Sequence, residues 1–534
     1  MTTRAFAFSF GVTLVAAIAA PALVSARCDA QSAPAASLGI FRGHDDVGRP
    51  SVLGAGSVRY DAATRTYAIT GGGANMWATS DHFHYVWIKV SGDVSLEATV
   101  RFVATSPSTG TPDPHRKACL VIRQSLDSDS PYADAATHGD GLTSLQWRAE
   151  KGAVTHEVQT DLVRPTRLRV EKRGDFVSMS VASDGGAMRP AGGAAKLTLS
   201  GDYYIGLAVS AHDTTRLETA EFSRVALTRL PRVSGPTTLV STLETISLRS
   251  RDRRVAYVVR QPERIESPTW FPDSTRTLYF NTRGRLYRVQ ADVPGRPVNP
   301  RRLASPEEVG LGLQAEIHGG HLVSRDGRLW AIGDESPSPS GTLSSVIIVV
   351  PANGGTPRRV TPPGRSYVHG WAPDGSRLAF TGVRGGNLDV FTVAADGSAE
   401  ARLTTHAARD DGPEYSPDGQ FIYFHSSRTG RSQIWRMRAD GTEAEQLTND
   451  ELDNRFAHVS PDGKSLVFLS SEPGAEGGPA LGDVALRIMT LATRRIEAIA
   501  QLTGGQGTIN ANSWSPDGEY LAFVSYQVVR ARSE

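Results

Sequence analysis

One short string recurs six times in the second half of this chain, and its regular spacing limits the folds that the chain can adopt. The fullest version reads Ser-Pro-Asp-Gly, and the aspartates follow one another at intervals of 53, 48, 44, 44 and 55 residues. Proline presets φ for the first turn position, aspartate bonds to its own backbone and glycine accepts a positive φ, so each string predicts a tight turn. A unit that recurs at this period indicates a repeat array. The six strings are Phe271–Ser274, Ser324–Gly327, Ala372–Gly375, Ser416–Gly419, Ser460–Gly463 and Ser515–Gly518.

Each predicted turn lies between short apolar segments that are typical of strands. A large side chain such as Trp371 stands two positions before the proline, and an apolar segment such as Leu378–Phe380 begins four residues after the aspartate. A second pair of segments follows, for example Asp389–Val393 and Ala401–Thr404. Four strands in a period of about 50 residues match the blade of a β-propeller.

The last repeat ends two strands short, after the segment 521–526. The segments Thr245–Leu248 and Arg254–Val259 precede the first turn and are the natural candidates for the missing pair. The two ends of the propeller would then complete a sixth blade together. Such closure covers strand edges that would otherwise pair with other chains.

The strings Trp514–Gly518 and Ile434–Gly441 resemble the repeats of the TolB β-propeller family. The resemblance covers residues 245–528 and recurs in register. It implies a six-bladed propeller over residues 245–534 that serves as a binding platform for protein or peptide. One turn departs from the pattern, because Arg325 replaces the proline. The chain also lacks the small α/β domain that precedes the propeller in TolB itself.

The N-terminal residues are typical of an export signal. A basic start at Arg4 is followed by an apolar run, 5–20, and by small residues up to Ala26. This order predicts a signal peptide over residues 1–26, a flexible linker over 27–37, and a periplasmic or secreted protein with no membrane span after cleavage. An uncleaved anchor and a lipidated Cys28 are the alternatives, although Arg27 does not fit the small residue that lipidation needs.

Residues 38–228 carry no such turn string, but apolar and polar residues alternate strongly along them. In the segment Val94–Phe102, for example, every second residue is apolar. A period of two predicts half-buried antiparallel strands, and no convincing helical pattern interrupts them. The predicted fold class is therefore all-β, with a β-sandwich over 38–228, an interdomain linker over 229–244 and the six-bladed propeller after it.

The segments Asn75–Asp93 and His115–Arg148 resemble a concanavalin-like jelly roll, a fold that often binds glycans on one sheet face. On this resemblance we expect polar residues of two predicted strands, and of the long connection between them, to form one sugar-binding patch. Ordinary solvent-facing alternation is the competing interpretation. The candidate residues are Arg123, Tyr132, His138, Gln146 and Arg148.

The sequence carries few signs of catalysis or of nucleic-acid binding. The 57 basic and 56 acidic residues leave a net charge of +1, so no broad basic surface for nucleic acid is expected. The motifs of serine hydrolases, P-loop proteins and zinc peptidases are absent from the sequence. Aligning the turns, however, places His321, His369 and Asn512 at one repeat position of the predicted inner strands. Two neighbouring blades would then present imidazoles to one channel, where they could hold a divalent metal.

Two classes of function follow from these features. The leading hypothesis is a non-enzymatic binding or scaffold protein of the cell envelope, with a protein or peptide partner for the propeller, a glycan for the sandwich and no resident cofactor. The alternative is a carbohydrate-active enzyme, a polysaccharide lyase or hydrolase, that uses the histidine-rich channel with a divalent metal.

The export signal gives a testable prediction. We expect the mature chain to begin after Ala26, or after the rival site Ala30, and to carry no lipid, because Arg27 precedes the only cysteine near the cleavage site. Intact mass measurement and N-terminal sequencing of the exported protein check this expectation. A diacylglyceryl group on Cys28 would contradict it.

Overall fold

The computed structural model describes residues 37–49, 51–103, 111–160, 162, 164–231, 237–273, 276–291, 307–309, 311, 317–337, 343–474 and 481–530. The predicted signal peptide and Cys28 lie outside these residues. The regular structure within them consists of strands and one short 3-10 helix, Gln506–Thr508. The predicted all-β class is therefore confirmed. Within the described ranges, no helix is both long enough and apolar enough to span a bilayer.

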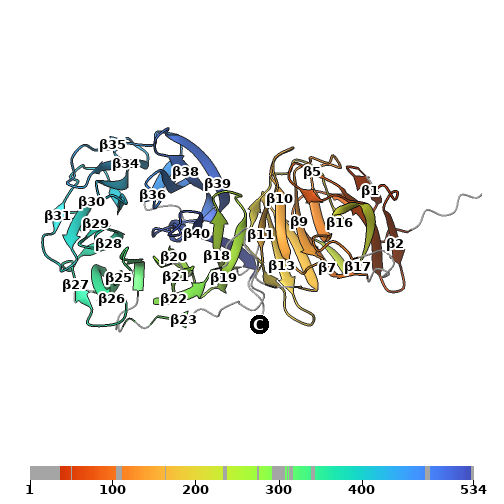
Figure 1. Ribbon diagram of the computed structural model, residues 1–534, viewed down its shortest axis with the longest axis horizontal. Helices are drawn as coiled ribbons and strands as arrows, with labels where there is room; N and C mark the ends of the chain where they lie inside the picture. Colours follow the sequence, from red (N-terminus) through yellow and green to blue (C-terminus); the bar gives the residue numbers. More distant parts are fainter. Residues whose placement is uncertain are drawn as a thin grey trace, which may run out of the picture. The chain divides into compact units, whose positions relative to one another are not determined.

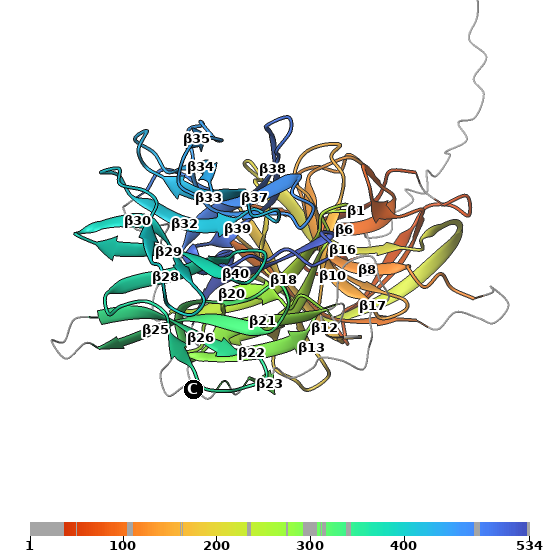
Figure 2. The same ribbon diagram turned by 60° about the vertical axis from the view of Figure 1, so that its left-hand side comes forward.

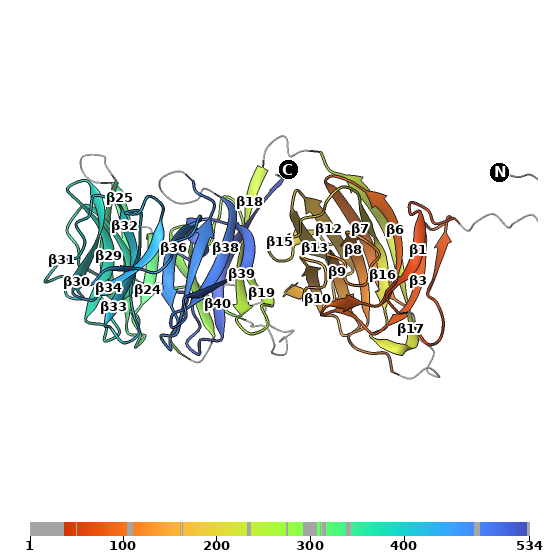
Figure 3. The same cartoon turned by 90° about the horizontal axis from the view of Figure 1, so that it is seen from above.

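The strands of residues 43–229 form two large sheets that share an apolar core, and a small third sheet of β4 and β5. The alternation of Val94–Phe102 places Leu96 in this core, where it packs with residues such as Leu120 and Ile122 of the other sheet. Figure 3 shows these strands from above. The strands are β1 (Gly43–Val47), β2 (Ser57–Asp61), β3 (Thr66–Gly73), β4 (Met76–Trp77), β5 (Ser80–Asp81), β6 (Phe83–Val90), β7 (Val94–Phe102), β8 (Lys117–Arg123), β9 (Tyr132–His138), β10 (Thr143–Arg148), β11 (His156–Gln159), β12 (Arg167–Arg173), β13 (Phe176–Ala182), β14 (Arg189–Pro190), β15 (Ala195–Lys196), β16 (Tyr203–Ser210) and β17 (Asp213–Arg229).

The two sheets differ in how they are covered. One sheet has the order β14-β13-β12-β7-β17-β3-β2, with β15 on β13, and alternates between buried and more exposed residues in the manner predicted. The other begins β1-β6-β16-β8-β9-β10-β11 and continues through β19 and β18 to β40. Its strands β8 and β9 are buried at every residue. Cys119 in β8 is a buried free thiol.

The remaining strands form successive antiparallel groups that are arranged in a ring (Figure 1). Within one group, β29 pairs with β28 on one side and with β30 on the other, and the three strands lie side by side (Figure 2). The strands are β18 (Thr237–Ser247), β19 (Arg253–Arg260), β20 (Glu266–Trp270), β21 (Thr277–Thr282), β22 (Arg285–Gln290), β23 (Glu307–Glu308), β24 (Ile317–Val323), β25 (Leu329–Pro337), β26 (Leu343–Pro351), β27 (Arg358–Arg359), β28 (Arg365–Trp371), β29 (Arg377–Arg384), β30 (Asn387–Ala394), β31 (Ala401–Arg402), β32 (Asp410–Tyr415), β33 (Phe421–Ser426), β34 (Gln433–Arg438), β35 (Glu445–Gln446), β36 (Asp453–Val459), β37 (Ser465–Ser471), β38 (Gly482–Thr490), β39 (Arg495–Gly504) and β40 (Tyr520–Arg530).

The two ends of the propeller meet in one group of strands, and this part of the closure prediction is confirmed. Strand β18 lies between β19 and β40, and its ladder with β40 runs from Thr237 opposite Arg530 to Ser247 opposite Tyr520. Residues 237–244, which the sequence analysis assigned to a linker, are therefore part of a central strand. Buried Glu244 accepts two hydrogen bonds of 2.8 Å from Arg253 in β19, so this strand is fixed by its side chains as well.

The turn strings fold in the way that their residues predict. In the turn after β32, Ser416 Oγ donates to Asp418 Oδ1 at 2.5 Å, the same oxygen accepts from the Gln420 backbone at 3.0 Å, and Gly419 has φ 72°. The hydrogen bond from Ser416 lowers the pKa of Asp418 below its ordinary value. Equivalent serine–aspartate bonds hold the turns at Asp326, Asp462 and Asp517.

Candidate functional site

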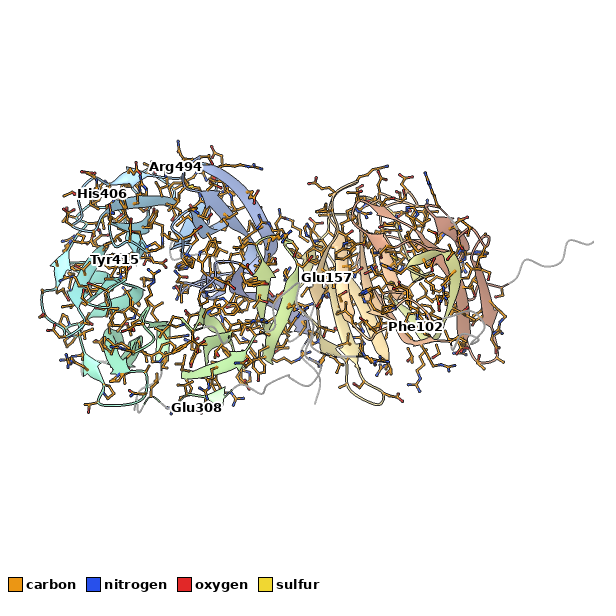
Figure 4. The ribbon with its side chains drawn as sticks, in the orientation of Figure 1. Phe102, Glu157, Glu308, His406, Tyr415 and Arg494 are labelled. Atoms are coloured by element: carbon orange, nitrogen blue, oxygen red, sulfur yellow. The ribbon has the colours of Figure 1, made fainter. Side chains whose placement is uncertain are left out.

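The turns surround a cavity of about 380 Å³ on one face of the ring. We call this cavity the mouth cavity. Its walls are the last residues of the inner strands, whereas Glu308, His406 and Arg494 lie at the outer edge of the ring (Figure 4). The large side chains that precede each turn line it, together with the turn prolines and Arg325. The lining residues of these two kinds are Trp270, Val323, Trp371, Tyr415, Val459, Trp514, Pro272, Pro373, Pro417, Pro461 and Pro516.

One wall of the mouth cavity is a hydrogen-bonded network that connects three neighbouring inner segments. Glu414 in β32 accepts from Asn512 Nδ2 at 2.7 Å and from the Val459 backbone at 3.1 Å, and its other oxygen lies 2.6 Å from His458 Nδ1. The second ring nitrogen of His458 lies 2.6 Å from the carbonyl oxygen of Ile509. The network therefore satisfies the carboxylate of Glu414 from within the protein.

Sequence reasoning missed His458, although a signal for it existed. His458 pairs with Val467, and Glu414 pairs with Tyr423, one residue before the end of each inner strand. The two side chains thus occupy the same repeat position on neighbouring strands. The predicted site residues His321, His369 and Asn512 stand one residue closer to the chain start within their repeats.

His369 and His321 do not meet, and the prediction that both line one channel is wrong. His369 lines the mouth cavity, as does Asn512, but His321 is fully buried, with its ring 5.9 Å from that of Trp330. The reason is a bulge. In β28 the register shifts between Val368 and Gly370, so His369 lies outside the ladder, whereas His321 in β24 is paired with Ile332.

A second cluster of titratable residues lies behind His369. His369 Nε2 is 3.5 Å from one oxygen of Asp411, and His425 Nε2 is 3.8 Å from the other. Burial alone would raise the pKa of Asp411, but hydrogen bonds from His369 and Thr381 and the nearness of His425 hold it well below its usual range. Burial lowers the pKa of His425 to about 4. Among the described residues, no three or more His, Cys, Asp or Glu side chains are arranged to hold a metal ion.

The predicted sugar-binding patch is not on the surface, and this prediction is wrong. Arg123 and Arg148 are both 0% exposed, and Arg148 makes a bidentate contact with Asp81, at 2.8 and 2.9 Å. The short segment Met76–Asp81 covers this face, and its carbonyl groups accept from the buried side chains: Ala78 from Arg148 at 3.1 Å and Met76 from Tyr132 at 3.4 Å. Sequence alternation identified one shared face but could not show what covers it.

The other members of the patch are buried as well. Gln146 accepts a hydrogen bond of 2.9 Å from the ammonium group of Lys117, which also donates to the Met76 carbonyl. His138 has a ring nitrogen 3.1 Å from the Leu142 carbonyl, and burial lowers its pKa to about 3. These contacts show a polar interior in which each of these side chains has an internal partner.

Comparison with known proteins agrees with the repeats and the ring of strands. Residues 344–478 match the family model described as the TolB beta propeller domain. The uncharacterized protein Atu1656 of Agrobacterium fabrum strain C58 is 40% identical over 286 residues, which are 54% of this chain and 92% of that protein. The chain therefore belongs to the family of proteins with a TolB-type β-propeller domain.

Two solved structures are similar as well. One, provisionally assigned as TolB from Agrobacterium tumefaciens, is 39% identical, and the match covers 55% of this chain and 100% of that chain at a TM-score of 0.49. TolB from Acinetobacter baumannii is 14% identical, with coverage of 62% and 78% and a TM-score of 0.37. The match of residues 344–478 to the family model confirms the predicted TolB-type propeller, while the concanavalin-like identity of residues 38–228 stays a prediction.

The buried pair of Asp81 and Arg148 gives a prediction on stability. Arg148→Ala leaves a buried carboxylate without its bidentate partner, and breaking a buried ion pair in this way costs about 3–5 kcal/mol. We expect a clear fall in the melting temperature of the protein. The control Lys151→Ala removes an exposed partner of Asp127 and should change stability by about 0.5 kcal/mol or less. Equal melting temperatures for the two variants would contradict the structural role of Arg148.

The buried His321 predicts how stability depends on pH. Burial lowers the pKa of His321 to about 3, whereas an unfolded histidine titrates near about 6.5. Between these values the unfolded chain binds a proton that the folded chain does not, so the free energy of unfolding falls as the pH falls. We expect about 3 kcal/mol of loss from this group between pH 6.5 and pH 4. As the pH is lowered from 7.5 to 4, the melting temperature should fall less steeply for His321→Leu than for the wild type, and parallel curves would refute the assignment.

Proposed function

We propose that this chain is an exported binding protein of the cell envelope, and that its mouth cavity receives an extended segment of a partner protein. The observation that carries the proposal is the composition of that cavity, which combines aromatic and proline side chains with a small number of fixed polar groups. Binding sites commonly have an apolar wall of this kind, with a few polar groups that orient the ligand. The signal-like residues 1–26 support export, and a periplasmic or secreted location follows from them.

The overall arrangement proposed is a six-bladed propeller that follows a concanavalin-like sandwich. The strand groups of the ring and the pairing of β18 with β40 support the blade count. The two facing sheets of residues 43–229 support the sandwich. A glycan role for the sandwich loses its predicted site, because the five candidate side chains are buried.

The alternative function, a carbohydrate-active enzyme with a divalent metal, rested on two histidines that converge in the channel. Only His369 of that pair lines the mouth cavity, and its nearest recorded acidic partner, Asp411, is also bonded to Thr381 at 2.7 Å. These contacts favour binding over metal-dependent catalysis at this site. Elemental analysis of the purified protein, together with an assay of polysaccharide turnover, tests the alternative directly.

Site-specific crosslinking tests the proposed binding function. A photoreactive phenylalanine derivative at Pro516, which is exposed on the mouth cavity, should crosslink the full-length protein to a defined partner in cells. The same group at His406, on the outer edge of the ring, is the matched control and should give no such product (Figure 4). Crosslinks from His406 alone would place the partner elsewhere and would contradict the proposal.

A further inference from the structure

Arg325 is the residue that breaks the repeat pattern, and it does so at the mouth cavity. The other five turn strings have proline at this position. In the structure these prolines form part of the cavity wall, so an arginine here places a cation within an otherwise apolar rim. The substitution does not disturb its own turn, because Ser324 Oγ still donates to Asp326 at 2.6 Å and Gly327 keeps a φ of 73°.

The side chain of Arg325 extends across the mouth. Its Nη1 donates to the carbonyl oxygen of Pro417 at 3.0 Å, in the turn after β32 and 92 residues further along the chain. Arg325 also lines the two hollows that adjoin the mouth cavity, one beside Pro461 and Pro516 and the other beside Pro417 and Pro461. Arg325 thus lines the mouth cavity and both of the hollows beside it.

The charges around the cavity favour an anionic group on the ligand. Arg325, His369, Glu414 and Tyr415 are the titratable side chains that line it. Glu414 already accepts from Asn512 and Val459 and contacts His458, and His369 lies beside Asp411. Arg325 is exposed, and the one hydrogen bond that the structure records for it in the described part of the chain uses a single N–H of its five.

We propose that Arg325 binds a carboxylate of the partner segment and thereby selects acidic ligands for the mouth cavity. This inference rests on the proposed function, because it names the chemistry of the segment that the cavity receives. A guanidinium fork matches the two oxygens of a carboxylate, and such charge-assisted bonds are stronger than the bond to a neutral carbonyl that Arg325 makes to Pro417. The apolar walls would then contact the neighbouring side chains of the segment.

Two sources of carboxylate share this chemistry, an aspartate or glutamate side chain and the C-terminus of a chain. We would probe the full-length protein with two arrays of the same random octapeptides, one with amidated C-termini and one with free C-termini. A side-chain ligand gives binders rich in acidic residues in both arrays, whereas a C-terminal ligand gives binders in the free array only. For the best synthetic binder, Arg325→Pro should weaken binding by about tenfold or more, the usual effect of losing a hydrogen bond to a charged group.

Matched variants distinguish carboxylate binding by Arg325 from a purely structural role of this residue. Arg325→Pro restores the residue of the other five turns, and Arg325→Lys keeps the charge but loses the fork, so it should retain part of the affinity. Arg495→Ala removes an exposed arginine that lines an adjoining hollow but not the mouth cavity, and it should leave binding unchanged. Binding to the exposed Arg325 should also weaken as salt is added, because salt screens exposed charges.

The possible outcomes distinguish the inference from the proposed function. If peptides bind at the mouth but show no preference for carboxylates and no loss in Arg325→Pro, the inference fails and the proposed function stands. If no peptide binds to the wild type, and Pro516 gives no crosslink, both fail. If Arg325→Pro lowers the melting temperature and leaves the peptide profile unchanged, Arg325 only ties two turns together and the inference is overturned.

Discussion

The structure of the propeller depends on the antiparallel ladder between β18 and β40. Strand β19 pairs with the other side of β18. The partners in this ladder lie about as far apart in the sequence as the propeller allows, since Thr245 is opposite Ala522. Without it, the last strand would present a free edge and the ring would stay open. The buried contact of Glu244 with Arg253 and Ser525 supports the ladder with side chains from all three strands. The mouth cavity exists because this ladder brings the last turn beside the first.

The parts of the fold that sequence reasoning predicted are those that local chemistry determines. The Ser-Pro-Asp-Gly turns depend on residues that are neighbours in the chain. The alternation along Val94–Phe102 depends only on the pleated backbone of that single strand. Both are confirmed. The predicted linker over 229–244 failed at its second half, because residues 237–244 belong to a strand that pairs with β40, far along the chain, as well as with the nearby β19.

The candidate sites were harder to predict, because small non-local features decide them. A one-residue bulge moves His369 into the cavity, while His321, at the same position in the sequence alignment, stays paired and buried. Arg123 and Arg148 were predicted to belong to one surface patch; both lie beside Asp81, but the segment around Asp81 covers them. Neither a bulge nor a covering segment produces a periodic pattern in the amino-acid sequence. Glu414 and His458, by contrast, share a repeat position and could have been found by shifting the alignment by one residue.

The ring of turns also has a consequence for orientation. A wall of equivalent prolines and aromatic side chains has nearly rotational symmetry, so by itself it would accept a ligand in several equivalent rotations of similar energy. Two features remove this degeneracy: the network of Glu414 and His458 on one side, and Arg325, which reaches from another side to Pro417. Very few substitutions thus give a ligand one preferred orientation in the cavity of a nearly symmetric ring. The remaining turns can stay identical, and the geometry of the ring is preserved.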